Sequence, residues 1–205
     1  SFSAIQTALK AGELDRARER IADWRGEPVL PRTREEIVRL SVEEALLASQ
    51  RHVFGVLFWY VLLPGPSGAI LYRLAAFLCR RWGGQAAFGE FARRALFVLE
   101  WPAVRLTAAA FAVVGDFEDA IYCWRTQARA WPDPNAGVVL ASGAGAMGVR
   151  LGMPLAAGDA PLRPELGVGE DADAPALDAT VGLLWRALVV WVFVLILLSA
   201  GRLLG

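Results

Sequence analysis

The stretch VGLLWRALVVWVFVLILLSAGRLL, residues 181–204, decides the fold class of this chain. It carries no charge between Arg186 and Arg202, and Trp185 stands next to the first of these arginines. A helix needs about 20 apolar residues to cross roughly 30 Å of hydrocarbon, and arginines at its ends can reach the headgroups. We therefore predict a C-terminal transmembrane helix in residues 181–205.

The overall composition agrees with a membrane protein. Of the 205 residues, 56% are hydrophobic and 20% are charged, and the mean hydropathy is +0.40. The apolar residues are clustered in blocks, whereas soluble proteins spread them so that one face stays wet. The formal net charge is zero, so no nucleic-acid partner is expected, because phosphates demand a basic excess. The expected partner is the lipid bilayer.

The residues that could hold a metal or a disulfide are few. Cys79, Cys123 and His52 are the cysteines and the histidine of the chain, and they stand far apart in the sequence. Zinc sites need several such ligands at short spacings, and a disulfide framework needs more cysteines. No metal site is predicted.

A second apolar block covers residues 53–79, VFGVLFWYVLLPGPSGAILYRLAAFLC, and has no charge before Arg73. The run that precedes Pro64 is about a dozen residues long, too short to cross a bilayer. The block is either one span broken at residues 64–68, or a re-entrant hairpin, or two short helices joined by a surface turn. A break at membrane depth needs protein or water to satisfy its backbone, so this break is a candidate binding site.

A third apolar block, ALFVLEWPAVRLTAAAFAVVG, covers residues 95–115 and contains Glu100 and Arg105. Charges inside a span are costly and face a partner or a cavity. A structural pairing of the two, snorkelling of Arg105 and a role in a site all remain open. If 53–79, 95–115 and 181–204 each cross once, the arginines at 80, 81, 93 and 94 lie on the opposite side from the polar regions.

The remaining regions are polar. Residues 1–50 read as soluble amphipathic helices, and Thr33-x-x-Glu36 resembles a capping box that opens one of them. Residues 116–180 hold a polar helix, a turn at WPDPNAG, a glycine-rich stretch and an acidic loop. Gly143-x-Gly145 fits either close helix packing or a phosphate contact. The prediction is an all-α, polytopic integral membrane protein divided at 1–50, 51–115, 116–180 and 181–205.

Several blocks together resemble the CobD/CbiB family of membrane proteins of cobalamin biosynthesis, and its relative AmpE. The most specific block is PDPNAGVVLASGAGAMGVRLG, residues 132–152. The family pattern there is S-P-N-A-G, a run of alanine and glycine, and L-G-V-R-L-G-G. The other blocks are ALKAGELDRARERIADW, EEIVRLSVEEA, RHVFGVLFWYVLLPGPSGAILYR and WPAVRLTA. The resemblance implies the bacterial inner membrane, and because the family has earlier hydrophobic segments, we expect this chain to lack its first spans.

Membership of that family would imply adenosylcobinamide-phosphate synthase activity. This reaction joins a carboxylate of adenosylcobyric acid to an amino alcohol or its phosphate, with ATP and Mg²⁺ to activate the carboxylate. By resemblance, a corrinoid or phosphorylated small molecule would be bound by Tyr72, Arg73, Arg93, Arg105, Asn135, Gly137 and Arg150.

The departures from the family pattern concern its acids. Where the family has E-S-x-x-E-N-x-x-D-G, Glu43 is kept, but Leu47 and Arg51 replace the second glutamate and the aspartate. Ala95 and Leu96 replace the two aspartates of a later motif. Alanine and leucine cannot hold magnesium. RHVFGVLFWYVLLPGPSGAILYR and GDFEDAIYCWR look closer to the AmpE-like branch, which is linked to signalling around β-lactamase induction.

The sequence therefore predicts a non-synthase sensor, accessory or interaction subunit, with other membrane proteins as possible partners and no assigned cofactor. The alternative is an amide-forming enzyme of cobalamin biosynthesis, which would use a corrinoid and ATP with Mg²⁺. A transporter is disfavoured, because the chain shows no inverted repeat.

Overall fold

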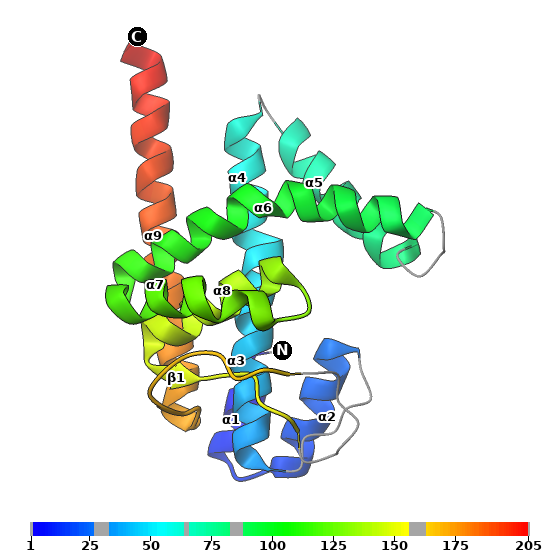
Figure 1. Ribbon diagram of the computed structural model, residues 1–205, viewed down its shortest axis with the longest axis vertical. Coiled ribbons are helices and arrows are strands. Elements are labelled where there is room, and N and C mark those ends of the chain that lie inside the picture. Colours follow the sequence, from blue (N-terminus) through cyan, green and yellow to red (C-terminus); the bar gives the residue numbers. More distant parts are fainter. Residues whose placement is uncertain (1, 27–32, 64–65, 83–87, 156–162, 205) are drawn as a thin grey trace.

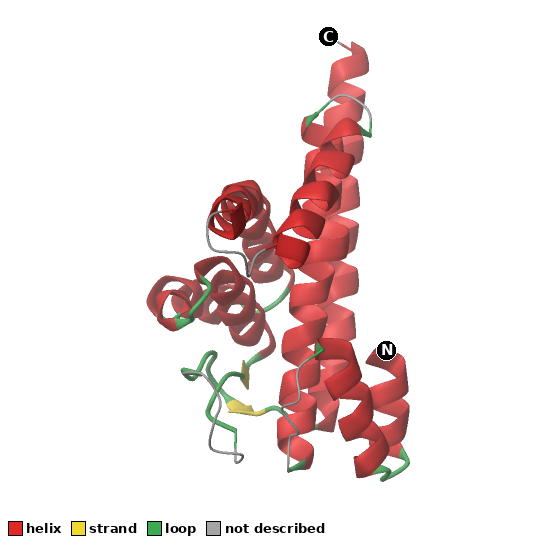
Figure 2. Ribbon diagram, turned by 90° about the vertical axis from the view of Figure 1, so that its right-hand side faces the viewer, coloured by secondary structure: helices red, strands yellow, loops and turns green. Residues whose placement is uncertain are grey.

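The computed structural model describes residues 2–26, 33–63, 66–82, 88–155 and 163–204. Almost all of them are helical, which confirms the predicted all-α fold. Two long upright columns stand side by side, and a layer of helices lies across them (Figures 1 and 2). In chain order the elements are α1 Phe2–Lys10, α2 Leu14–Arg25, α3 Arg34–Ser49, η1 Gln50–Phe54, α4 Gly55–Leu62, α5 Ser67–Trp82, α6 Phe88–Val114, α7 Phe117–Thr126, η2 Ala128–Ala130, α8 Pro134–Met147, β1 Val149–Arg150, β2 Glu170–Asp171 and α9 Ala174–Leu204.

The first column is one continuous helix made of α3, η1 and α4. It begins at the predicted capping box: Glu36 N–H donates to the Thr33 hydroxyl, and Thr33 N–H donates to the Glu36 carboxylate, both at 3.2 Å. In its middle, η1 is a π-helical turn of 5 residues, Gln50–Phe54. The column continues to Leu62, so no helix end marks the expected division at residue 50.

The second column is α9. It starts at Ala174, before the predicted residue 181, and its upper half is exposed and apolar (Figure 1). Among the described residues, three helical stretches are long and apolar enough to cross a membrane: Arg34–Leu62, Gly89–Val114 and Ala174–Gly201. These stretches confirm the expectation of a helical membrane protein.

Residues 53–79 form a helical hairpin. Helix α4 ends at Leu62, and α5 begins at Ser67; Pro64 and Gly65 of the expected break lie outside the described residues. The two helices pack so closely that a Cβ on Gly68 would lie 1.9 Å from the Trp59 carbonyl oxygen. The chain therefore turns back, which excludes a single broken span. A re-entrant hairpin and two short helices joined by a surface turn both fit this arrangement.

Helices α6, α7 and α8 form the layer that crosses the columns (Figure 1). Helix α8 contains the glycine-rich stretch, and residues 135–146 of it are all buried. A Cβ on Gly145 would lie 2.4 Å from the Asp119 carbonyl oxygen of α7, and one on Gly143 would lie 2.9 Å from the Leu46 side chain of α3. Close packing, the first of the two readings of this stretch, therefore explains its small residues.

The core lies where the layer meets the columns. Phe54 of η1 contacts Phe111 of α6 and Trp191 of α9, with ring centroids 6.0 and 6.1 Å apart. All three side chains are buried. These aromatic contacts pack α6 against both columns and fix its height along them.

Candidate functional site

A large pocket lies between η1, α5, α6 and the turn before α8. It has a volume of about 1030 Å³. We call it the arginine pocket, because five arginines line it. Its polar and charged lining consists of Arg51, His52, Arg73, Cys79, Arg80, Arg93, Arg94, Glu100 and Asp133.

The π-turn and the hairpin bring these side chains together. A π-helical turn holds more residues than an α-helical turn, and such turns recur at functional sites. Here it carries Arg51 and His52 to the pocket wall. Helix α5 then folds back, and a Cβ on Gly55 would lie 2.7 Å from the Tyr72 ring. Because α5 packs this closely on the first column, Arg73 contacts His52 at the pocket wall.

Polar contacts fix the walls of the arginine pocket. Arg73 Nη1 lies 2.7 Å from His52 Nδ1, so the ring nitrogen that faces the guanidinium accepts. The Tyr72 hydroxyl donates to Glu100 Oε1 at 3.2 Å, which links α5 to α6. Trp59 Nε1 donates to the Leu99 carbonyl oxygen at 3.0 Å and links α4 to α6.

The charge of the pocket is strongly positive. Five guanidinium groups face two carboxylates, those of Glu100 and Asp133. Arg94 also pairs with Glu90 at 2.5 Å, outside the lining. Guanidinium groups match the oxygens of phosphates and carboxylates in a planar, bidentate geometry. The pocket is therefore suited to an anion that carries several oxygens.

A small inner recess continues the arginine pocket toward α8. Both share Arg51, Glu100 and Asp133. Gln50 and Asn135 complete the polar lining of the recess, and Leu47 belongs to its apolar lining. Gln50 and Asn135 are 3% and 2% exposed. Within the described residues, both amide atoms of Gln50 and the Asn135 Oδ1 have no hydrogen-bond partner.

Such orphaned amide atoms are unusual. A buried polar group without a partner costs about 1–3 kcal/mol. The Asn135 side chain is held in place, because its Nδ2 donates to the Phe97 carbonyl oxygen at 3.0 Å. The recess thus presents fixed, unsatisfied donors and acceptors next to the arginines.

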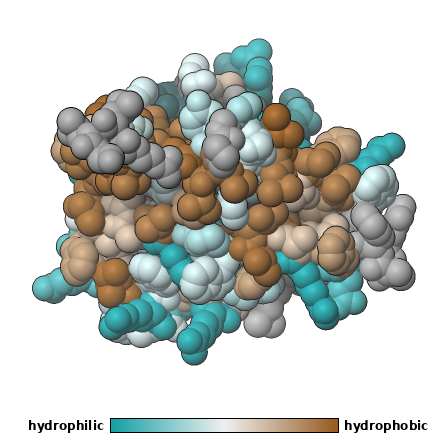
Figure 3. All heavy atoms as spheres, turned by 90° about the horizontal axis from the view of Figure 1, so that it is seen from above, coloured by the Kyte–Doolittle hydropathy of each residue, from teal (hydrophilic) through white to brown (hydrophobic). Residues whose placement is uncertain are grey.

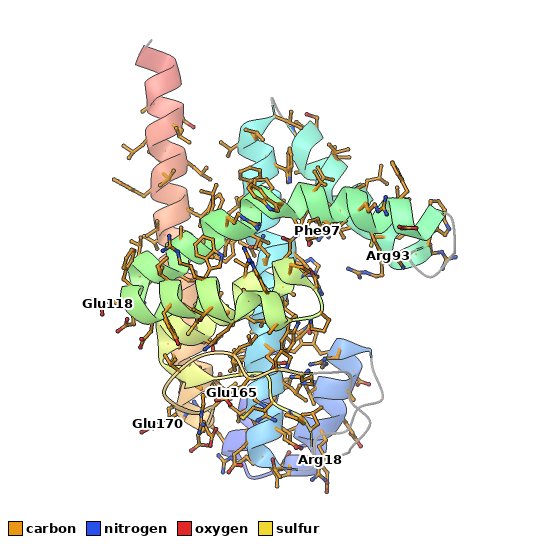
Figure 4. The ribbon with its side chains drawn as sticks, in the orientation of Figure 1. Arg18, Arg93, Phe97, Glu118, Glu165 and Glu170 are labelled. Atoms are coloured by element: carbon orange, nitrogen blue, oxygen red, sulfur yellow. The ribbon has the colours of Figure 1, made fainter. Side chains whose placement is uncertain are left out.

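The predicted ligand-binding residues separate into two sets. Arg73 and Arg93 line the arginine pocket, Asn135 lines the recess, and Tyr72 is buried behind Arg73 against Glu100. Figure 4 shows Arg93 and Phe97 along the same half of α6. These four predicted residues are brought to one place.

The other three predicted residues lie elsewhere. Arg105 stacks on Trp101, with its Cζ 3.9 Å from the ring centroid, and donates to the Trp101 carbonyl oxygen. It forms no ion pair with Glu100 among the described contacts. Gly137 packs against η2, where a Cβ would lie 2.1 Å from the Ala128 carbonyl oxygen.

Arg150 is remote from the arginine pocket. It forms ion pairs with Asp171 at 3.0 Å and with Glu165 at 3.6 Å. Figure 4 shows Glu165 low on the molecule, far from Arg93 and Phe97. The strand pair β1–β2, in which Val149 and Arg150 face Glu170 and Asp171, explains this position.

Sequence reasoning missed several residues of the site. The sequence indicated Arg51 only as the replacement of a family aspartate and Asp133 only as part of a turn, and it gave His52 and Gln50 no role in a site. The arginine pairs at 80–81 and 93–94 could have indicated an anion site, because packing of α5 against α6 brings the two pairs together. Among the described residues, no group of three His, Cys, Asp or Glu side chains is placed to hold a metal ion.

Comparisons with known proteins agree with the fold. A family model described as "CobD/Cbib protein" matches residues 1–200. "Cobalamin biosynthesis protein CobD" of Stutzerimonas stutzeri (strain A1501) is 36% identical over 197 residues, which cover 94% of this chain and 65% of the relative. The protein of the same name from Chromobacterium violaceum is 37% identical over 211 residues, which cover 98% and 65%. The chain thus spans 65% of the length of both curated relatives. No solved structure matches the chain.

Proposed function

This chain belongs to the CobD/CbiB family, and we propose that it serves cobalamin biosynthesis as a membrane protein that binds a phosphorylated small molecule or a corrinoid. The observation that carries this proposal is the convergence of five arginines on one pocket of about 1030 Å³. A phosphate in this pocket would meet guanidinium groups from three elements, η1, α5 and α6.

The pocket can distinguish the parts of such a ligand. Arginines hold the phosphate or carboxylate, and Glu100 and Asp133 can take a cationic or hydroxyl group beside it. The orphaned amides of Gln50 and Asn135 fit an uncharged group that both donates and accepts hydrogen bonds. This division favours a ligand with one anionic end and one neutral polar end.

We further propose that the chain binds this ligand without performing the synthase reaction. Three positions where the family pattern has acids lie in the pocket or its recess: Leu47, Arg51 and Leu96. Activation of a carboxylate with ATP and Mg²⁺ needs carboxylate ligands for the metal. Arginines would fit the phosphates of a nucleotide, but two leucines and an arginine offer nothing to magnesium.

The role that follows is an accessory, sensing or interaction subunit in the bacterial inner membrane. The AmpE-like branch, where such a role is expected, is favoured by the same three replacements. Other membrane proteins are its proposed partners. The arginine pocket would then report on, or deliver, an intermediate to a catalytic partner.

The alternative is an amide-forming enzyme of the synthase type. Glu100 and Asp133 favour it, because two carboxylates remain in the positive pocket. In that case Glu100 would be positioned by the Tyr72 hydroxyl and could accept a proton from the attacking amine.

Binding calorimetry on the full-length protein in nanodiscs tests the proposal. The probes are aminopropanol phosphate, adenosylcobyric acid, and ATP with and without Mg²⁺. We expect Arg73→Gln to weaken binding of the phosphorylated probe by about 10-fold or more, because a charge-assisted hydrogen bond is worth roughly 1.5–3 kcal/mol. Arg150→Gln is the matched control, since Arg150 lies outside the pocket.

One further measurement distinguishes the accessory role from the synthase alternative. Mass spectrometry after incubation with all substrates detects the amide product if the chain is a synthase. Product formation would refute the accessory role and favour the alternative. Failure of every probe to bind would refute the ligand proposal itself.

A further inference from the structure

The first candidate span, Arg34–Leu62, is only partly available to a membrane. Its lower half, α3, buries Glu36, Arg39 and Glu43 within the polar body of the molecule. What stands above the core is α4, whose 8 residues rise about 12 Å at 1.5 Å each. That is less than half of the roughly 30 Å of a hydrocarbon core.

The hairpin then returns toward the side from which it came. Helix α5 runs back down and outward from the tip (Figure 1). Its outer face exposes Ile70 and Leu74, each more than half exposed, while Tyr72 is buried. Arg73 and the exposed Phe77 line the arginine pocket. An amphipathic helix of this kind suits the boundary between headgroups and acyl chains.

Helix α6 has the same two-sided character. Phe91 and Leu106 are 68% and 50% exposed, and the exposed Trp101 stands between them in the sequence. Val98 is exposed too, but it lines the arginine pocket. Ala103 and Thr107, on the inner face, are fully buried. Figures 1 and 2 show that this helix runs across the columns instead of along them.

The level of this layer fits the lower boundary of the bilayer. Viewed from above, the molecule presents a mainly apolar surface, with hydrophilic residues gathered toward the rim (Figure 3). Trp191 of α9 lies at the level of α6, since both pack on Phe54. Above that contact, α9 exposes Phe193, Ile196 and neighbouring apolar side chains.

We propose that α5 and α6 form a surface that lies in one leaflet of the bilayer, parallel to the membrane, and that the α4–α5 hairpin is re-entrant. The occupant of the surface is lipid: acyl chains on Ile70, Leu74, Phe91 and Leu106, and headgroups at the rim. Continuity with the exposed apolar half of α9 supports lipid as the partner. Of the described helices, α9 then crosses the membrane and α6 does not.

This arrangement changes the topology expected from the sequence. With three crossings, the arginines at 80, 81, 93 and 94 lie opposite the polar regions. With a re-entrant hairpin, they lie on the same side as α1–α3 and α7–α8. The positive-inside rule then places the arginine pocket and the polar body together in the cytoplasm. The inference rests on the fold and holds whether or not the proposed ligand binds.

Cysteine accessibility in sealed membrane vesicles of both orientations tests it. Single cysteines are introduced as Arg81→Cys, as Glu118→Cys and on a Gly-Ser tag appended after Gly205, in a Cys79→Ser background; the buried Cys123 can stay. We expect an impermeant maleimide to label Arg81→Cys and Glu118→Cys from one side and the tag cysteine from the other. Labelling of Arg81→Cys from the side of the tag cysteine would show that α4 and α6 cross, and would overturn the proposal.

A spin label at Leu106→Cys identifies what covers the surface. In nanodiscs we expect the label to collide with dissolved oxygen more than with a water-soluble nickel chelate, at a shallower depth than a label at Leu198→Cys. Preference for the nickel chelate would mean that the face lies in water. Protection from both reagents would mean that a second copy or another protein covers it, and either result would refute the lipid surface.

Discussion

Glu43 of α3 and Arg163 pair across 120 residues of sequence, with Arg163 Nη2 2.7 Å from Glu43 Oε1. Their side chains are 2% and 7% exposed. The same carboxylate accepts the Gly152 N–H at 2.9 Å. The first column is thereby tied to two points of the long connection between β1 and β2, so Glu43, kept from the family pattern, has a structural role here.

Replacing Glu43 by glutamine should therefore destabilise the protein strongly. Loss of the charge leaves the Arg163 guanidinium buried without a counter-ion, which costs about 3–5 kcal/mol. The midpoint of thermal unfolding in detergent should fall by several degrees. Glu165→Gln is the matched control, because its ion pair with Arg150 is half exposed and worth at most about 1 kcal/mol. Equal losses in the two variants would contradict this role of Glu43.

Gly145→Ala should destabilise the layer of α7 and α8. The added Cβ would lie 2.4 Å from the Asp119 carbonyl oxygen, so the two helices must move apart. Overpacking of this kind costs about 1–3 kcal/mol. At Gly182 of α9 a Cβ meets no atom within 4 Å, and Gly182→Ala should be neutral or stabilising, since alanine favours a helix. Unfolding temperatures of the two variants in the same detergent make the comparison.

The thiol of Cys123 should react slowly at neutral pH. Burial, and secondly the negative charge of Asp119, raise the pKa of this thiol from 9.0 to about 11. Only the thiolate is nucleophilic, so alkylation should stay slow at pH 7.5 and become fast once the chain is denatured. The folded state holds its proton more tightly, so this group lowers stability only as the pH rises above about 9. Rapid alkylation of the native protein at pH 7.5 would show that Cys123 is open to solvent.

Gln50→Leu should separate stability from binding. The leucine removes two buried amide atoms that have no partner, so the ligand-free protein should be as stable as before or more stable. Binding of the phosphorylated probe should weaken, because the recess loses its donor and acceptor. Unfolding temperatures and calorimetric titrations report the two quantities separately. A large loss of stability with unchanged binding would mean that Gln50 serves the fold.

Local features of the fold could be predicted from the sequence. The turn at Gly12, with φ +77°, between α1 and α2 and the capping box at Thr33 each depend on a few neighbouring residues. The apolar run of α9 can be recognised from its own composition, without knowledge of the helices that pack on it. Helix α9 begins at Ala174, before the predicted start at residue 181. Pro175 and Asp178 are typical of a loop, but proline is well tolerated in the first turn of a helix.

The site was predictable only in part, because it depends on long-range packing. Arg73 and Asn135 were found through the family pattern, but so was Arg150, which pairs with Asp171 instead. No local sequence signal indicates that α5 packs back along α4. Arg80 of α5 and Arg93 of α6 line the same pocket only because these helices fold together. Gln50 carries no motif, and its importance follows from burial without a hydrogen-bond partner.

The π-turn at Gln50–Phe54 makes the length of the first column as important as its composition. It holds one residue more than an α-helical turn would, and each residue of a helix advances by about 100° around the axis. Deleting one residue there would leave a regular α-helical turn of nearly the same rotation, so Glu43 and Gly55 would keep their relative directions. Deleting one residue of α4 between Gly55 and Trp59 would instead rotate the helix beyond it by about 100°, and Trp59 would turn away from α6. A deletion within α4 should therefore disable the hairpin more completely than a deletion within the π-turn.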